Sequence, residues 1–174
     1  LLPRIYLPVF LLIQLPELFL LLLFGGAVWA VLRLWRDHPP LERLLAPGLV
    51  IFAAIFPIAY AVESHATLFD GMRHFLFVEP PLACCAAFVF DAAIERLRSS
   101  PRAFATAAAA LALYLGYHVS LMAALHPDEY VYYNALVGGV PGAAGRFKLD
   151  YWANSYREAT GDLAPQVGQR VADP

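Results

Sequence analysis

Charged residues are scarce in this chain. Only 15% of its 174 residues are Asp, Glu, Lys or Arg, whereas 60% are hydrophobic. Charged residues make up roughly a quarter of ordinary soluble domains, so the composition excludes that class. The mean hydropathy of +0.59 favours a membrane protein instead.

The chain also lacks a basic excess and closely spaced metal ligands. Its net charge of −2 provides no basic surface for nucleic-acid phosphates, so we expect no nucleic-acid partner. Its two cysteines, Cys84 and Cys85, are adjacent, which suits neither a zinc site nor an ordinary disulfide. We predict that both are small core residues. No helical pair of the HExxH type occurs, and we expect no metal site.

Long apolar runs are abundant. A helix of about 20 mostly apolar residues crosses the bilayer core, and four stretches are long enough: about 16–34, 44–62, 80–96 and 103–125. The Pro80–Pro81 pair suits the first turn of the third helix. The sequence therefore predicts an all-α integral membrane protein, with a transmembrane bundle over residues 1–125.

Residues 126–174, which we call the tail, differ in composition from the bundle. They are rich in tyrosine and glycine, and are too polar for the bilayer yet too aromatic for simple disorder. Because a segment of this length is small for a core of its own, we expect loops and a short helix on the outer face of the bundle. The start of a truncated domain is the alternative.

Arginines predict the orientation of the bundle. Three arginines bracket the first connection between spans, and three bracket the third: Arg33, Arg36 and Arg43, then Arg96, Arg98 and Arg102. Short loops rich in Lys and Arg tend to remain cytoplasmic. We therefore predict that the second connection, both termini and the tail are extracytoplasmic.

The second connection contains the strongest chemical feature. Asp70, Arg73 and His74 lie close together around Gly71. Arg73 can hold a phosphate through paired hydrogen bonds, His74 can donate another, and Gly71 permits a close backbone turn. The structural alternative is that Arg73 reaches lipid headgroups while Asp70 caps the following helix.

A second polar group, His126, Asp128, Glu129 and Tyr130, directly follows the fourth span. Asp128 or Glu129 could orient a hydroxyl nucleophile, and the tyrosines of residues 130–133 could stack on a sugar or lie along an isoprenoid. An interfacial aromatic belt is the alternative.

Polar residues inside the spans are assigned structural roles. His118 and Tyr114 lie within the fourth span, where a polar side chain usually faces the bundle. A hydrogen bond that packs helices is the structural interpretation of His118, and a functional role is the alternative. Asp91 and Glu95 lie near Arg96 and Arg98 at the end of the third span, and we expect them to snorkel or to be paired rather than to be catalytic.

Several runs resemble one family. Residues 68–78 (LFDGMRHFLFV) and 126–134 (HPDEYVYYN) are followed in order by 138–139 (GG), 145–147 (GRF) and 150–152 (DYW). They resemble bacterial family 39 glycosyltransferase-type membrane proteins, which are similar to the dolichyl-phosphate-mannose protein mannosyltransferases of the GT-C class. The resemblance covers only the C-terminal portion of such an enzyme. Since the chain starts at Leu1 rather than at methionine, we expect an N-terminal half to be missing.

The resemblance implies a hexosyltransferase of the bacterial plasma membrane that moves a sugar from a polyprenyl-phosphate donor to an extracytoplasmic acceptor. It implies no cofactor, and it places the catalytic aspartate in a first outer loop upstream of this chain. It assigns two groups of site residues: Asp70, Arg73 and His74 near the donor phosphate or its lipid, and His126, Glu129 and Tyr130 on the acceptor side of the cavity. The alternative is a non-catalytic membrane module that binds lipid headgroups or a partner membrane protein.

Overall fold

The computed structural model describes residues 4–66, 72–150, 156, 159–161 and 163. Its long elements are α2 (Glu17–Asp37), α3 (Leu41–Glu63), α4 (Glu79–Leu97) and α5 (Pro101–Leu125), and this part of the chain contains no strand. All four are long and apolar enough to cross a membrane, α4 together with the preceding 3₁₀ helix η1 (Arg73–Val78). The prediction of an all-α membrane protein with four spans is confirmed.

The first two spans extend past their predicted ends. α2 continues to Asp37, where Arg33 Nε lies 3.1 Å from Asp37 Oδ2 one turn along the helix. It stops at His38, whose φ of 40° is left-handed. α3 begins at Leu41 and contains two prolines, Pro47 and Pro57. These small shifts are of the size that frayed helix ends produce.

The last two spans begin where local signals indicate. α4 starts at Glu79 and has the Pro80–Pro81 pair in its first turn, as predicted. α5 starts at Pro101, two residues earlier than predicted, because Ser100 Oγ accepts a hydrogen bond from the backbone N–H of Ala103 at 3.4 Å. The predicted pairing of Glu95 with Arg98 at the end of α4 is present.

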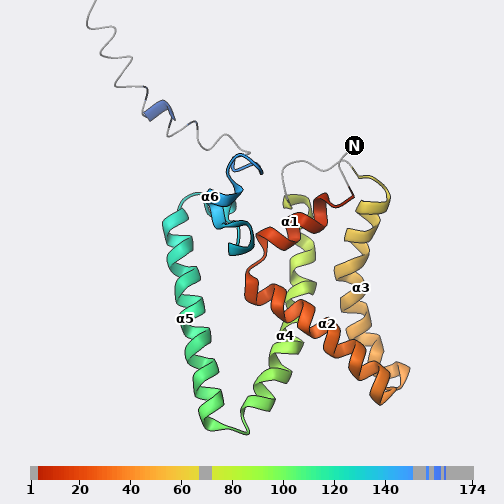
Figure 1. Cartoon of the computed structure of the whole chain (residues 1–174). Helices are drawn as coiled ribbons and strands as arrows, with labels where there is room; N and C mark the ends of the chain where they lie inside the picture. Colours follow the sequence, from red (N-terminus) through yellow and green to blue (C-terminus); the bar gives the residue numbers. More distant parts are fainter. Residues whose placement is uncertain (1–3, 67–71, 151–155, 157–158, 162, 164–174) are drawn as a thin grey trace, which may run out of the picture.

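A shorter helix, α1 (Tyr6–Gln14), precedes the spans. Leu15 after it has extended backbone, the conformation that a following proline favours, and α2 begins directly after Pro16. Figure 1 shows α1 at the end of the bundle opposite the α2–α3 and α4–α5 connections.

The buried core lies at the same end as α1. It collects residues from α1, the end of α3, η1 and the tail: Leu7, Phe10, Ile13, Ala61, Met72, Phe75, Val78, Tyr133 and Ala143. Elsewhere the spans expose large apolar side chains, including Leu21, Phe52, Phe88 and Val119. Such exposure suits helices surrounded by lipid tails, which are as apolar as the side chains themselves.

α4 is the central span, since it packs against α2 and α3 and also contacts α5. Figure 1 shows α4 and α5 meeting at their connection and diverging toward the other end. On α4, Cys84 is exposed and Cys85 is half-buried. The prediction that Cys84 is a core residue is therefore wrong, because that face of a membrane-spanning helix is available to lipid.

Residues 126–150 of the tail fold back against α1. They form η2 (Glu129–Val131), η3 (Ala135–Val137) and the short helix α6 (Gly139–Ala143). The hydroxyl of Tyr133 donates to the carbonyl oxygen of Lys148 at 2.9 Å. The ring of Phe147 stacks on Tyr133 at 5.8 Å between centroids and meets Phe10 of α1 edge-on at 5.6 Å. Aromatic packing thus joins α1 to the tail.

Candidate functional site

The predicted site residues that the structure describes lie at one end of the bundle. Five of the six are described: Arg73 and His74 at the start of η1, and His126, Glu129 and Tyr130 at the start of the tail. The η1 helix and the tail contribute to the same core, and both lie at the end that carries α1 (Figure 1). Asp70, the third predicted donor-side residue, lies outside the described residues.

The 3₁₀ geometry of η1 decides which side chains face the core. Met72, Phe75 and Val78 are buried at intervals of three residues, which is the repeat of a 3₁₀ helix. Arg73 is half-buried with its Nε atom shielded from solvent, and His74 is exposed. A guanidinium at a partly dry rim attracts an anion more strongly than it does in bulk water.

His126 and Glu129 form a close pair just beyond α5. His126 Nδ1 lies 2.6 Å from Glu129 Oε1, and both side chains are exposed. An ionised carboxylate only accepts hydrogen bonds, so Nδ1 is the donor. This hydrogen bond lowers the pKa of Glu129. The pair can orient a polar group at the surface of the protein.

The three tyrosines of residues 130–133 have different surroundings. Tyr130 is half-buried and its hydroxyl donates to Asp150 Oδ1 at 3.4 Å. Tyr133 is 2% exposed and belongs to the core. Tyr132 contacts residues of the spans, as described below. Tyr130 is therefore the tyrosine of this run that best fits the predicted acceptor side.

Asn134, to which the sequence assigned no separate role, fastens the tail to α1. It is 1% exposed, and its Nδ2 donates to the carbonyl oxygens of Leu12 at 2.7 Å and Leu15 at 2.8 Å. Its backbone N–H donates to Ile13 at 2.9 Å. These bonds satisfy carbonyl groups at the end of α1 that have no partner within the helix.

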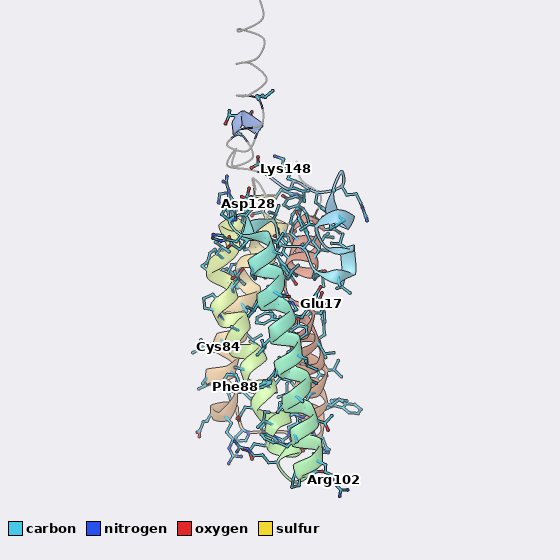
Figure 2. The ribbon with its side chains drawn as sticks, turned by 90° about the vertical axis from the view of Figure 1, so that its left-hand side faces the viewer. Glu17, Cys84, Phe88, Arg102, Asp128 and Lys148 are labelled. Carbon is cyan, nitrogen blue, oxygen red and sulfur yellow. The ribbon has the colours of Figure 1, made fainter. Side chains whose placement is uncertain are left out.

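Four further polar residues gather where α2, α5 and the tail meet, and we call them the Glu17 cluster: Glu17, Tyr114, His118 and Tyr132. Glu17 Oε1 accepts from the backbone N–H of Ala135 at 2.6 Å, and its Oε2 accepts from the hydroxyl of Tyr114 at 3.1 Å. That hydroxyl also accepts from the backbone N–H of Leu18 at 3.1 Å. Figure 2 shows Glu17 at a level between Phe88 and the labelled tail residues.

The hydrogen bonds of His118 define the state of its ring. Nδ1 lies 3.1 Å from the carbonyl oxygen of Tyr114, which can only accept, so Nδ1 carries a proton. In the neutral ring Nε2 is then an acceptor, and the hydroxyl of Tyr132 lies 3.4 Å from it. Nε2 is also 3.6 Å from Glu17 Oε2. Burial, and secondly the charge of Glu17, raise the pKa of Tyr132, which keeps its phenol protonated as a donor.

Two members of the Glu17 cluster, Glu17 and His118, are visible in the sequence as polar residues within apolar spans. His118 was expected to make a packing hydrogen bond, whereas the structure places it near α2 and the tail as well as its own helix. Glu17 is a carboxylate at the head of an apolar span, and ionisable residues within spans are usually functional or paired. The missing information was the identity of the partners.

The described residues contain no group of three or more His, Cys, Asp or Glu side chains that could hold a metal ion. Comparison of the chain with protein-family models, curated proteins and solved structures finds no match.

Proposed function

We propose that this chain is the C-terminal part of a membrane glycosyltransferase that moves a hexose from a polyprenyl-phosphate donor to an acceptor outside the bacterial plasma membrane. The proposal is supported by the resemblance of runs 68–78 and 126–134 to family 39 glycosyltransferases. In this proposal, the N-terminal half of the enzyme supplies the catalytic aspartate, and the fragment alone is inactive.

One structural observation carries the proposal: residues 72–78, the described part of the first run, lie at the same end of the bundle as the second run. Met72 and Phe75, on either side of Arg73 and His74, share a core with Tyr133 of the second run. A transfer of this kind needs a membrane-bound anionic headgroup and a water-soluble acceptor to meet at one surface. The shared core keeps Arg73 and His74 at the same end of the bundle as the second run, which supports such a meeting.

The two groups then have complementary roles. Arg73 binds the donor phosphate in a two-pronged contact and stabilises the charge that develops on it as the sugar leaves. His74 donates a further hydrogen bond, and Asp70 belongs to the same donor side. On the acceptor side, His126 and Glu129 orient the acceptor and Tyr130 offers an aromatic face.

The orientation of the bundle agrees with these roles. Figure 2 shows Arg102 at the end opposite Asp128 and Lys148. The arginines of the first and third connections favour a cytoplasmic location for that opposite end. The end with Arg73 and the tail is then extracytoplasmic, where a lipid-linked sugar is available without a nucleotide.

Arg73→Ala in the complete gene product tests the proposal. We expect the rate of hexose transfer from polyprenyl-phosphate-mannose or polyprenyl-phosphate-glucose to fall at least tenfold, because a charged contact to the leaving phosphate is lost. In Arg73→Lys the transfer rate should fall less, because lysine keeps the positive charge but cannot form the two parallel hydrogen bonds of a guanidinium. Arg102→Ala is the matched control at the opposite end, and its rate should not change.

Two outcomes would contradict the proposal in different ways. An unchanged rate in Arg73→Ala would refute the donor site while leaving the enzyme class standing. No transfer from either donor by the complete wild-type protein, combined with Arg73-dependent binding to anionic vesicles, would favour the non-catalytic module that binds lipid headgroups.

A further inference from the structure

The Glu17 cluster is the place where the outer half of α5 is attached to the rest of the molecule. No residue of α5 is fully buried, and α4 and α5 diverge toward this end (Figure 1). Tyr114 and His118 of α5 nevertheless contact Glu17 of α2. Polar contacts thus hold a helix that has little apolar packing of its own.

The same cluster holds the tail through two separate contacts. The backbone N–H of Ala135 donates to Glu17 Oε1 at 2.6 Å, a bond strengthened by the charge of the carboxylate. The hydroxyl of Tyr132 lies 3.4 Å from His118 Nε2. Both contacts depend on groups that exchange protons with water, namely the carboxylate and the imidazole.

We propose that Glu17 and His118 are positioning residues that hold the tail against α2 and α5, and that protonation of His118 weakens this hold. Because the tail begins with His126, Glu129 and Tyr130, the pair would also set the place of the acceptor-side residues. That consequence rests on the proposed function, whereas the attachment of the tail does not.

The protonation step follows from the ring geometry. A proton from water binds Nε2, the only ring nitrogen without one, and converts it from an acceptor into a donor. Tyr132 then loses its acceptor, and Nε2–H donates to Glu17 Oε2. The carboxylate shares its charge with the imidazolium, so it holds the N–H of Ala135 less strongly.

The other titratable groups around His118 do not compete for this proton. They are Glu17 from α2, Tyr114 and Tyr117 from α5, and Tyr132 from the tail; Tyr117 meets the His118 ring edge-on at 5.3 Å between centroids. Glutamate carboxyl groups ordinarily titrate below about pH 5, and tyrosine phenols only in alkaline solution. Between about pH 5 and pH 8, histidine is the side chain whose charge ordinarily changes.

Hydrogen–deuterium exchange of tail peptides in the complete, detergent-solubilised protein measures the attachment directly. We expect Glu17→Ala to raise the exchange rate of the peptide containing Ala135 about tenfold, because a charge-assisted hydrogen bond is lost. Glu42→Ala is the matched control, since Glu42 also lies in the first turn of an apolar span, α3, at the opposite end of the bundle. Glu17→Gln, which keeps the side-chain length and one acceptor oxygen, should give a smaller increase.

The pH dependence separates positioning from a merely structural role. After correction for chemical exchange, the rate in the wild type should rise about fivefold as the pH falls from about 8 to about 5, as expected for the loss of one neutral hydrogen bond. In His118→Gln the corrected rate should not vary with pH. A wild-type rate independent of pH, or the same dependence in His118→Gln, would overturn the role of His118.

The exchange assay uses no sugar donor, so its outcome is separate from that of the transfer assay. If Glu17→Ala does not fold, as judged by circular dichroism, Glu17→Gln tests whether Glu17 holds the tail. If the tail exchanges no faster in the folded Glu17 variant than in Glu42→Ala, the attachment of the tail through Glu17 is refuted. This conclusion does not depend on the result for Arg73→Ala.

Discussion

Replacing Asn134 by alanine tests how the tail is attached to α1. The substitution removes the two Nδ2 hydrogen bonds to Leu12 and Leu15, at 2.7 and 2.8 Å, and the bond from Leu136 N–H to Oδ1 at 3.1 Å. Asn134 is 1% exposed, so water does not readily replace these bonds. Counting about 1.5 kcal/mol for each Nδ2 bond gives about 3 kcal/mol, or roughly a hundredfold in the open population of the tail.

The assay is hydrogen–deuterium exchange of the peptide that contains Asn134, whose own N–H donates to Ile13. Leu136→Ala is the matched control, because Leu136 lies in the same η3 segment and is 68% exposed. Asn134→Asp should speed exchange at least as much as Asn134→Ala, because a carboxylate would face the carbonyl oxygens of Leu12 and Leu15. If Asn134→Ala speeds exchange no more than Leu136→Ala, the attachment through Asn134 is refuted.

Two further predictions concern the spans and the tail. A Cβ on Gly26 would lie 2.2 Å from Val89 Cγ2, whereas a Cβ on Gly25 meets nothing within 4 Å. Gly26→Ala should therefore lower the free energy of unfolding, measured by thermal unfolding, by about 1–3 kcal/mol. An equal loss in Gly25→Ala would refute this reasoning. In His126→Ala the pKa of Glu129 should rise toward its ordinary value, as followed by carbon NMR titration, because the hydrogen bond that lowers it is gone. The sign follows from linkage: a depressed carboxyl pKa stabilises the folded state above the unfolded pKa, and this contribution is lost as the pH falls through the folded value. An unchanged pKa would show that the 2.6 Å contact does not persist in solution.

The four spans could be predicted from the sequence because their signal is local. A run of about 20 apolar residues requires no partner to be recognised, and the Pro80–Pro81 pair marks the first turn of α4 within the run itself. Even the error at Cys84 has a simple origin. An apolar run indicates burial, but in a membrane the apolar surroundings are often lipid, and this side chain is exposed.

The contacts that attach the tail could not be predicted in the same way. Asn134 and Leu15 are 119 residues apart, and Glu17 and Ala135 are 118 residues apart. No periodic pattern relates residues at such separations, and the side chains alone do not reveal their partners. The sequence therefore indicated that His118 was an unusual residue for a span, but the structure was needed to identify Glu17 as its neighbour.

The packing of the tail also determines how the two groups of site residues are held relative to each other. Arg73 belongs to η1, whereas His126 follows α5 directly, and α5 is attached at this end mainly through polar contacts. The two groups therefore share no helix, and their separation depends on the tail packing against α1 and η1 through Tyr133. A loosened tail would leave every residue of the proposed site chemically intact while moving the acceptor side away from the donor side. Because effective catalysis demands accurate placement of reacting groups, the residues that attach the tail matter to the proposed transfer as much as the residues that would touch its substrates.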